Sequence, residues 1–231
     1  MYLIYYGGGS SPSMYLLLFL MIGLSMWASY KVTSNFDKYS DDIASKGLTG
    51  AEVAQLILQR NGINDVTVQP IAGKLTDHYD PRNKTLRLSQ TVYDKRSISA
   101  ISVAAHEVGH AIQHNEGYAF LKFRSLLAPV VSFSSNFVMI LILVGVMVRM
   151  TGLRNLGIAL YALAVLFHVI TLPVEFDASR RALLNLEQNS LITEDEKRGS
   201  KTVLRSAAMT YVASALVSVV QLLRLMGMRR D

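Results

Sequence analysis

Apolar and polar positions divide the chain into long runs that carry almost no charge and segments that carry nearly all of it. The apolar runs cover residues 14–30, 126–148, 153–173 and 207–226. A helix needs about 20 apolar residues to cross the hydrocarbon core of a bilayer, and these runs are close to that length. The pattern therefore predicts about four transmembrane helices, of which the second and third form a hairpin.

The segment 31–125, between the first and second runs, has the mixed composition of a small α+β domain. Thr49 and Glu52 have the spacing of a capping box, and apolar residues at helical spacing follow them. Asn61-Gly62 is typical of a helix end. These features predict one amphipathic helix early in the domain.

Short strands are expected after that helix. Residues 65–69 alternate between polar and apolar, and residues 75–80 and 85–89 flank a turn that contains Pro81. Extended peptides bind to edge strands by main-chain pairing. The hairpin is therefore either a shelf for a peptide or a purely structural element.

Two further segments have distinct compositions. Residues 1–13 contain three consecutive glycines and no charge, so we expect a flexible leader without the basic region of a signal peptide. Residues 174–202 are charged, and Thr193 followed by three acidic residues predicts a helix start there.

The clearest chemical signature lies in a helix that Ser97 is expected to open. His106 and His110 are four residues apart, so both imidazoles lie on one face of this helix and can bind one metal ion. Glu107 points into the same cleft, where its carboxylate can act as general base on a metal-bound water. This HExxH string predicts a zinc metallopeptidase. Charged residues on both sides of the helix argue against a position within the bilayer.

A hydrolytic zinc site has three protein ligands and an open position for water. Glu175, just after the third apolar run, is the expected third ligand, because a carboxylate from a second helix commonly completes such a site. Asp177 would then support the site by hydrogen-bonding a histidine or a nearby arginine. The alternative is that both acids are membrane-edge charges paired with Arg180 and Arg181.

Peptide hydrolysis also needs a donor for the oxyanion of the transition state. His78, Tyr79, His168 and Arg181 have the required chemistry, and the sequence does not choose among them. His168 stands in an apolar run, where a polar residue is a functional candidate by default, but its closeness to Pro173 favours an interfacial position.

Composition narrows the class of protein. The chain is 51% hydrophobic and has a formal net charge of +6, and its basic residues gather near the ends of the apolar runs. Such residues orient a membrane protein, so we expect a lipid bilayer and no nucleic acid as partner. The chain has no cysteine, so any zinc must be held by histidine and carboxylate.

The distribution of basic residues also predicts the side of the membrane. They are more numerous near the span ends that adjoin residues 31–125 and 174–202, which places the catalytic part in the cytoplasm. Arg149 and Arg154, at the hairpin between the second and third runs, favour the opposite orientation in the membrane.

Four strings of residues resemble the YugP family of bacterial membrane zinc metallopeptidases. They are residues 47–54, 75–82, 105–114 and 173–179, and the similarity runs from about Lys31 to the end of the chain. The order of HExxH, two spans and a glutamate is also similar to the HtpX-type and CAAX-processing membrane proteases of the gluzincin group.

The resemblance implies a zincin-like domain, one zinc ion bound by His106, His110 and Glu175, and Glu107 as the general base. The HtpX-type and CAAX-processing proteases carry Glu-x-x-x-Asp. This chain has Asp177 two residues after the glutamate and Ser179 at the fourth position.

We therefore expect an α-helical integral protein of the bacterial cell membrane, with about four transmembrane helices and a small α+β zincin-like soluble domain. Its expected function is that of a membrane-anchored endopeptidase acting on peptides or membrane proteins. The alternative is a non-catalytic assembly or adaptor protein whose structural zinc site is closed by His114 or His78.

Overall fold

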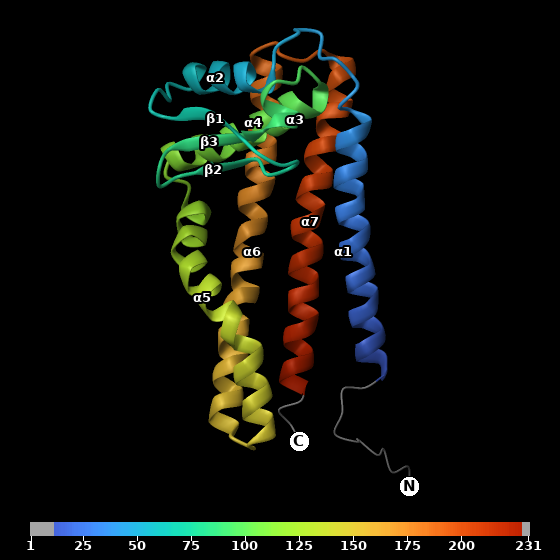
Figure 1. Cartoon of the computed structure of the whole chain (residues 1–231), viewed down its shortest axis with the longest axis vertical. Helices are drawn as coiled ribbons and strands as arrows, with labels where there is room; N and C mark the ends of the chain where they lie inside the picture. Colours follow the sequence, from blue (N-terminus) through green and yellow to red (C-terminus); the bar gives the residue numbers. More distant parts are fainter. Residues whose placement is uncertain (1–11, 228–231) are drawn as a thin grey trace. The chain divides into compact units, whose positions relative to one another are not determined.

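The computed structural model describes residues 12–227, which are mostly helical (Figure 1). Of the predicted leader 1–13, residues 1–11 lie outside the described part, and Pro12 and Ser13 belong to the first helix. The elements in chain order are α1 Pro12–Lys38, α2 Gly50–Arg60, β1 Thr67–Ile71, β2 His78–Asp80, β3 Thr85–Ser89, α3 Gln90–Tyr93, α4 Ile98–Asn115, α5 Ala119–Met147, α6 Thr151–Gln188 and α7 Glu194–Gly227.

Three of the described helices are long and apolar enough to cross a membrane: α1, α6 and α7. A fourth candidate span is a bent pair within α5, Ala119–Ser134 and Asn136–Met147, whose halves meet at 49°. Helices of this length and composition, together with a small sheet, confirm the predicted class at the coarse level of a helical protein with three to four candidate spans.

Two helices extend beyond the predicted spans. The third span was predicted at residues 153–173, and α6 continues through Pro173 to Gln188. Proline removes one main-chain hydrogen bond from a helix interior, yet its fixed φ is helical, so neighbouring turns can carry the helix onward. Likewise α7 runs unbroken from Glu194 to Gly227. In both helices the end of the apolar run marks a change from apolar to charged residues, and the backbone stays helical across it.

The described chain divides into two compact units. The first, here called the helical unit, contains residues 12–27, 124–170 and 212–227. The second, here called the sheet unit, contains residues 28–123 and 171–211.

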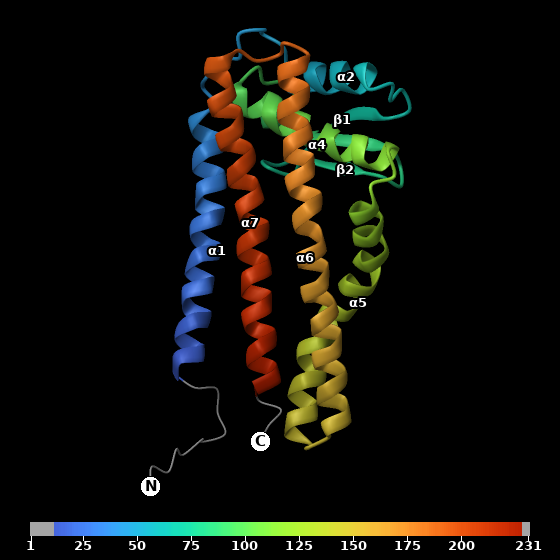
Figure 2. The same cartoon turned by 180° about the vertical axis from the view of Figure 1, so that it is seen from behind.

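The helical unit is organised by close packing of α5 against α6, whose adjoining ends lie side by side in Figures 1 and 2. A Cβ on Gly157 would lie 2.6 Å from Ile142 Cγ1, and one on Gly145 would lie 2.6 Å from the Arg154 main-chain nitrogen. The two glycines therefore allow a backbone approach that no other residue would permit. Val138, Ile142 and Leu225 form the buried cluster of this unit.

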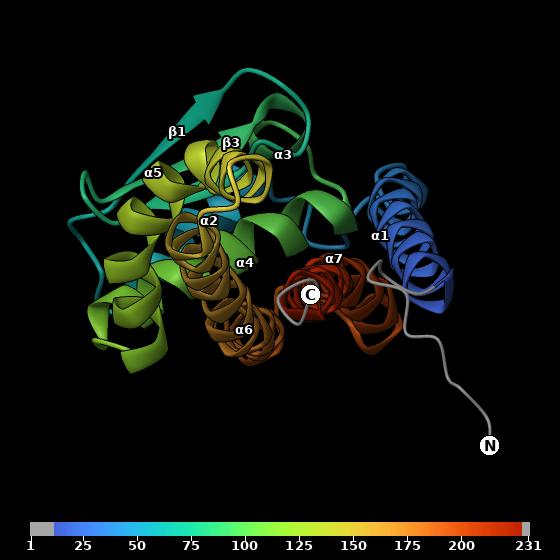
Figure 3. The same cartoon turned by 90° about the horizontal axis from the view of Figure 1, so that it is seen from below.

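The sheet unit is built around a three-stranded sheet of order β1-β3-β2. The central strand β3 is parallel to β1 and antiparallel to β2, and four of its five residues are buried. Helix α4 contacts α2 and the strands β2 and β3, and Figure 3 shows it beside the sheet. The helix with the two histidines is thus the centre of this unit's core.

Local signals in this unit agree with the sequence. Thr49 and Glu52 form the predicted capping box of α2, and Gly62, with φ +70°, follows its end. Ser97 caps α4 by accepting a hydrogen bond from the Ala100 main-chain N–H at 3.2 Å.

The first two strands are displaced from their predicted positions. β1 was expected at 65–69, but pairing begins where the Thr67 N–H donates to the Lys84 carbonyl oxygen and continues to Ile71. Pro70 lies inside β1, which an edge strand tolerates because the missing N–H need not pair. The strand predicted at 75–80 is reduced to His78–Asp80. Pairing with β3 sets both ranges, and local alternation does not contain that information.

Candidate metal centre

The two histidines of α4 face α6 because a glycine between them lets the helices approach closely. A Cβ on Gly109 would lie 2.6 Å from the Ala178 carbonyl oxygen and 3.1 Å from its Cα. Only a residue without a side chain fits this contact. The close approach brings the residues that precede and follow Ala178 on α6 to the histidine face of α4.

Three side chains meet at this contact. The Nε2 atoms of His106 and His110 lie 3.3 and 3.7 Å from the same atom, Oε2 of Glu175. One ligand atom from each residue can be chosen so that all lie within 4.8 Å of one another, which is the geometry of a group that could hold a metal ion. The side chain of Glu175 is only 2% exposed and each histidine side chain 12% exposed. The structure thus brings together the three residues that the sequence proposed as ligands.

The hydrogen bonds of His110 show that its inner nitrogen is oriented for a cation. Nε2 of Gln113 donates to the Val174 carbonyl oxygen at 2.8 Å and to Oδ2 of Asp177 at 2.9 Å, so the amide nitrogen faces two acceptors. Oε1 of Gln113 must then accept from Nδ1–H of His110, 3.0 Å away. With Nδ1–H bonded to Gln113, Nε2 of His110 is the nitrogen that faces Glu175, and it is the atom through which the imidazole could bind a cation.

His106 contacts Ser179 of α6 through its Nδ1 atom. Oγ of Ser179 lies 3.2 Å from Nδ1 of His106. Ser179 stands four residues after Glu175 on α6, one helical turn further along. The sequence showed a serine at this position, but it did not show that Ser179 reaches the first histidine.

Asp177 lies behind the site rather than on it. Its carboxylate accepts hydrogen bonds from Arg180 at 2.6 Å and from Arg181 at 2.5 Å, besides the bond from Gln113. Arg181 also pairs with Glu116 at 2.8 Å. Asp177 therefore contacts the two arginines directly and reaches His110 only through the amide of Gln113.

Glu107 follows His106 directly in α4 and is almost completely buried. Burial raises its pKa to about 7, and the negative charges of Glu175 and Asp77 add to this rise. The positive charge of His106 and a hydrogen bond from the Tyr79 main chain act in the opposite direction. A carboxyl group with a pKa near neutrality can both accept and return a proton.

A model of the family described as "Putative neutral zinc metallopeptidase" matches residues 14–230 of the chain. The chain belongs to this family. It is also similar to the Bacillus subtilis (strain 168) protein named "Putative membrane protease YugP", with 53% identity over 212 residues that cover 90% of this chain and 94% of that protein. No solved structure matches the chain. The name of this relative and the apolar helices support association with a membrane.

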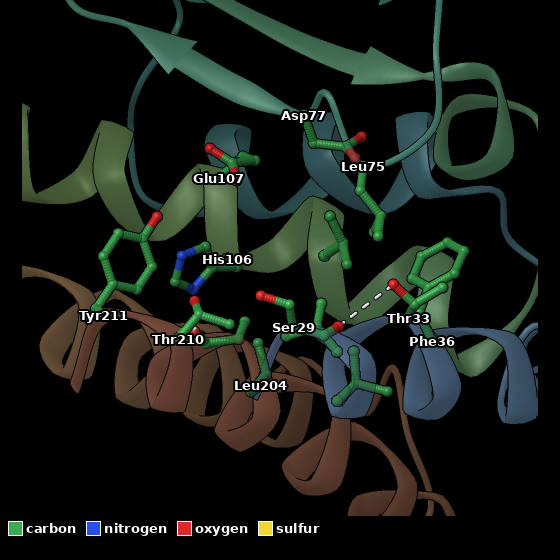
Figure 4. Close-up of a pocket in the computed structure, with 14 residues that line it drawn as sticks. Ser29, Thr33, Phe36, Leu75, Asp77, His106, Glu107, Leu204, Thr210 and Tyr211 are labelled. Carbon is green, nitrogen blue, oxygen red and sulfur yellow. Dashed lines mark hydrogen bonds between the residues drawn. The ribbon is translucent and has the colours of Figure 1, made fainter. Parts of the chain in front are cut away.

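A cavity of about 450 Å³ borders the histidine helix, and His106 and Glu107 line it (Figure 4). Its walls come from the end of α1, from α4, from the first half of α7 and from the loop before β2. Asp77 and Tyr211 also line it, and Figure 4 shows the Tyr211 side chain beside His106. Tyr211 was not predicted, because a tyrosine in an apolar helix a hundred residues further along gives no local signal.

The four residues proposed as oxyanion donors lie elsewhere or are already paired. Among the described residues lining the cavity, none is His78, Tyr79, His168 or Arg181. The hydroxyl of Tyr79 bonds Nδ1 of His114 at 2.8 Å, and Nδ1 of His78 bonds the Thr76 carbonyl oxygen. His168 belongs to the helical unit.

The alternative of a closed structural site gains no support from this arrangement. Within residues 12–227, the group that could hold a metal contains His106, His110 and Glu175 and neither of the proposed fourth ligands. His114 is bonded to Tyr79, and His78 lies near Arg87, with 3.4 Å between its Nε2 and the guanidinium nitrogen. Three ligands leave one coordination position open, as in catalytic zinc sites.

Proposed function

We propose that the protein is a membrane-anchored zinc-dependent endopeptidase that hydrolyses peptide bonds of membrane or membrane-proximal proteins. The observation that carries this proposal is the convergence of two imidazole nitrogens on the carboxylate of Glu175, with Glu107 beside them on the wall of a cavity. A donor set of two histidines and one glutamate fits zinc, and it is the set found in hydrolytic rather than structural sites.

In this mechanism His106, His110 and Glu175 would hold one zinc ion. When bound there, the ion would polarise a water molecule and the scissile carbonyl. Glu107 takes the proton of the attacking water and delivers it to the leaving amine, for which a pKa of about 7 is well matched. Gln113 and Ser179 fix the orientation of the two imidazoles through their Nδ1 atoms.

Tyr211 is the oxyanion donor that the cavity supports best. Its side chain lies beside His106 on the wall of the cavity (Figure 4). A phenol donor near the developing oxyanion stabilises the transition state more than the ground state.

The surroundings of the site support a zincin-like domain of the gluzincin type. A sheet lies beside the histidine helix, which contacts its edge strand β2 as well as its central strand β3. Main-chain pairing along such an edge is a common way to hold an extended peptide. The basic residues near the span ends favour a cytoplasmic position for this domain.

The decisive experiment is the substitution Glu107→Gln in the purified, zinc-loaded protein. The amide keeps the size of the side chain but cannot accept the proton of water, so we expect one bound zinc and a loss of peptide cleavage of about 10²–10⁴-fold. Glu194→Gln, at an 87% exposed side chain outside the site, is the matched control and should cleave like wild type. A Glu107→Gln protein that cleaves as fast as wild type would rule out this mechanism.

A further inference from the structure

We infer that the cavity beside His106 and Glu107 binds an uncharged, apolar side chain of the substrate next to the scissile peptide bond. This inference rests on the proposed peptidase function, and it adds the class of residue at which the protein cleaves. The cavity is here called the side-chain pocket, and it lies entirely within the sheet unit.

The side-chain pocket adjoins the reacting groups. His106 and Glu107 form part of its wall, together with Tyr211 (Figure 4). A peptide bond placed at the metal centre would therefore carry one of its flanking side chains into this space. Because His106 belongs both to this wall and to the metal-binding group, a side chain held in the pocket lies next to the metal centre.

The wall of the pocket is chemically suited to an apolar group. Aliphatic and aromatic side chains from three different helices face it: Val32, Phe36, Val103, Val203, Leu204 and Ala207. Burying an apolar side chain against such a wall removes its surface from water, which is the favourable term in binding.

The charged residues of the pocket disfavour acidic substrate side chains and stabilise basic ones only weakly. Its carboxylates belong to Glu107 and Asp77, and none of the described residues that line it is lysine or arginine. Both oxygens of Asp77 already accept hydrogen bonds from Ser89, at 2.7 Å from the main-chain N–H and 3.0 Å from the hydroxyl. A buried acidic group would meet negative charge without a counter-ion, and a buried basic group would lose its hydration among aliphatic walls.

The size of the pocket selects for large residues. A cavity of about 150 Å³ is enough to bind benzene. The 450 Å³ of this pocket exceeds that several-fold, so a leucine or phenylalanine side chain fits together with part of its peptide unit. An alanine or glycine would leave most of the apolar wall uncovered.

The helices that form the pocket wall indicate which segments supply the leucine or phenylalanine of the substrate. Ser29 and Thr33 of α1 and Thr210 of α7 also line the pocket, and both helices are candidate membrane spans. Segments taken from other membrane proteins are rich in leucine and phenylalanine. A peptidase with this pocket would thus find its preferred residues in hydrophobic segments.

The first test uses quenched fluorescent peptides that differ only in one residue beside the cleaved bond. With zinc-loaded wild type in detergent, kcat/KM for leucine or phenylalanine should exceed that for aspartate, lysine or glycine at least about tenfold, because one large apolar contact in a pocket contributes 10–200-fold. Equal rates, or a preference for lysine or aspartate, would overturn the inference while leaving the peptidase itself intact.

A pair of variants on α7 places the preference in this pocket. Ala207→Phe adds a large side chain on the pocket wall, whereas Met209→Phe adds the same side chain at an exposed position two residues away. We expect Ala207→Phe to reduce the ratio of phenylalanine to alanine cleavage at least about tenfold, and Met209→Phe to leave that ratio unchanged. An unaltered ratio in Ala207→Phe would contradict the assignment.

A second measurement does not require turnover. A decapeptide containing benzoylphenylalanine, irradiated with the zinc-loaded Glu107→Gln protein, should attach to residues of the pocket wall such as Val103, Leu204 or Ala207, and excess leucine peptide should prevent this. Attachment elsewhere would refute the pocket even if cleavage is observed. If wild type cleaves nothing, the proposed function fails, and the attachment site still decides whether the pocket binds apolar side chains.

Discussion

Replacing Gln113 with leucine tests whether the hydrogen bonds behind the metal centre hold His110 in place. Gln113 is completely buried and links three groups, the Val174 carbonyl, Asp177 and Nδ1 of His110. Leucine has a similar volume but neither donor nor acceptor. The substitution therefore removes these bonds without leaving a large cavity.

Of the three partners of Gln113, His110 should be the one most affected by the substitution. Asp177 keeps its bonds to Arg180 and Arg181, and the Val174 carbonyl lies within α6, where main-chain bonding satisfies it. Nδ1–H of His110 loses its acceptor, and the imidazole becomes free to turn. Residues that orient a metal ligand contribute about 10–100-fold to metal affinity. At about 1.4 kcal/mol per factor of ten, the expected loss is about 1.4–2.8 kcal/mol of zinc binding free energy.

The assay is competition for zinc between the purified protein and a chromogenic chelator of known affinity, accompanied by thermal unfolding of the metal-stripped protein. Gln113→Leu should release zinc at a chelator concentration about 10–100-fold lower than wild type does. Gln55→Leu, at an exposed glutamine of α2, is the control for the chemical change itself. Wild-type zinc affinity in Gln113→Leu would refute the role of this amide in orienting His110.

Further predictions concern the ligands and the helix contact. Glu175→Ala should weaken zinc binding by more than about 100-fold in the chelator assay, and unchanged affinity would shift the ligand role to another carboxylate. Removing zinc should lower the unfolding temperature of wild type but not of Glu175→Ala, and equal shifts would contradict the assignment. Gly109→Ala should destabilise the protein by about 1–3 kcal/mol, because its Cβ would lie 2.6 Å from the Ala178 carbonyl oxygen. Gly152→Ala, with nothing within 4 Å of the new Cβ, should cause no such loss in the same thermal unfolding measurement.

The sequence by itself determined the features that depend on local spacing. The i, i+4 placement of His106 and His110 fixes both imidazoles on one helix face whatever surrounds them. Capping residues such as Thr49 and Ser97 fixed helix starts because their side chains bond main-chain groups only two or three residues away. The apolar runs indicated candidate spans because crossing a bilayer requires length and hydrophobicity, which need no tertiary contacts to recognise.

Only the tertiary structure decided how distant residues combine. Ser179 and Gln113 support the histidines because α4 and α6 approach closely at Gly109, and Tyr211 reaches the cavity because α7 lies along it. The same holds for β1, whose limits follow from its pairing with β3. A hydrogen bond between two helices depends on their separation and rotation, and the periodicity of a single segment determines neither quantity.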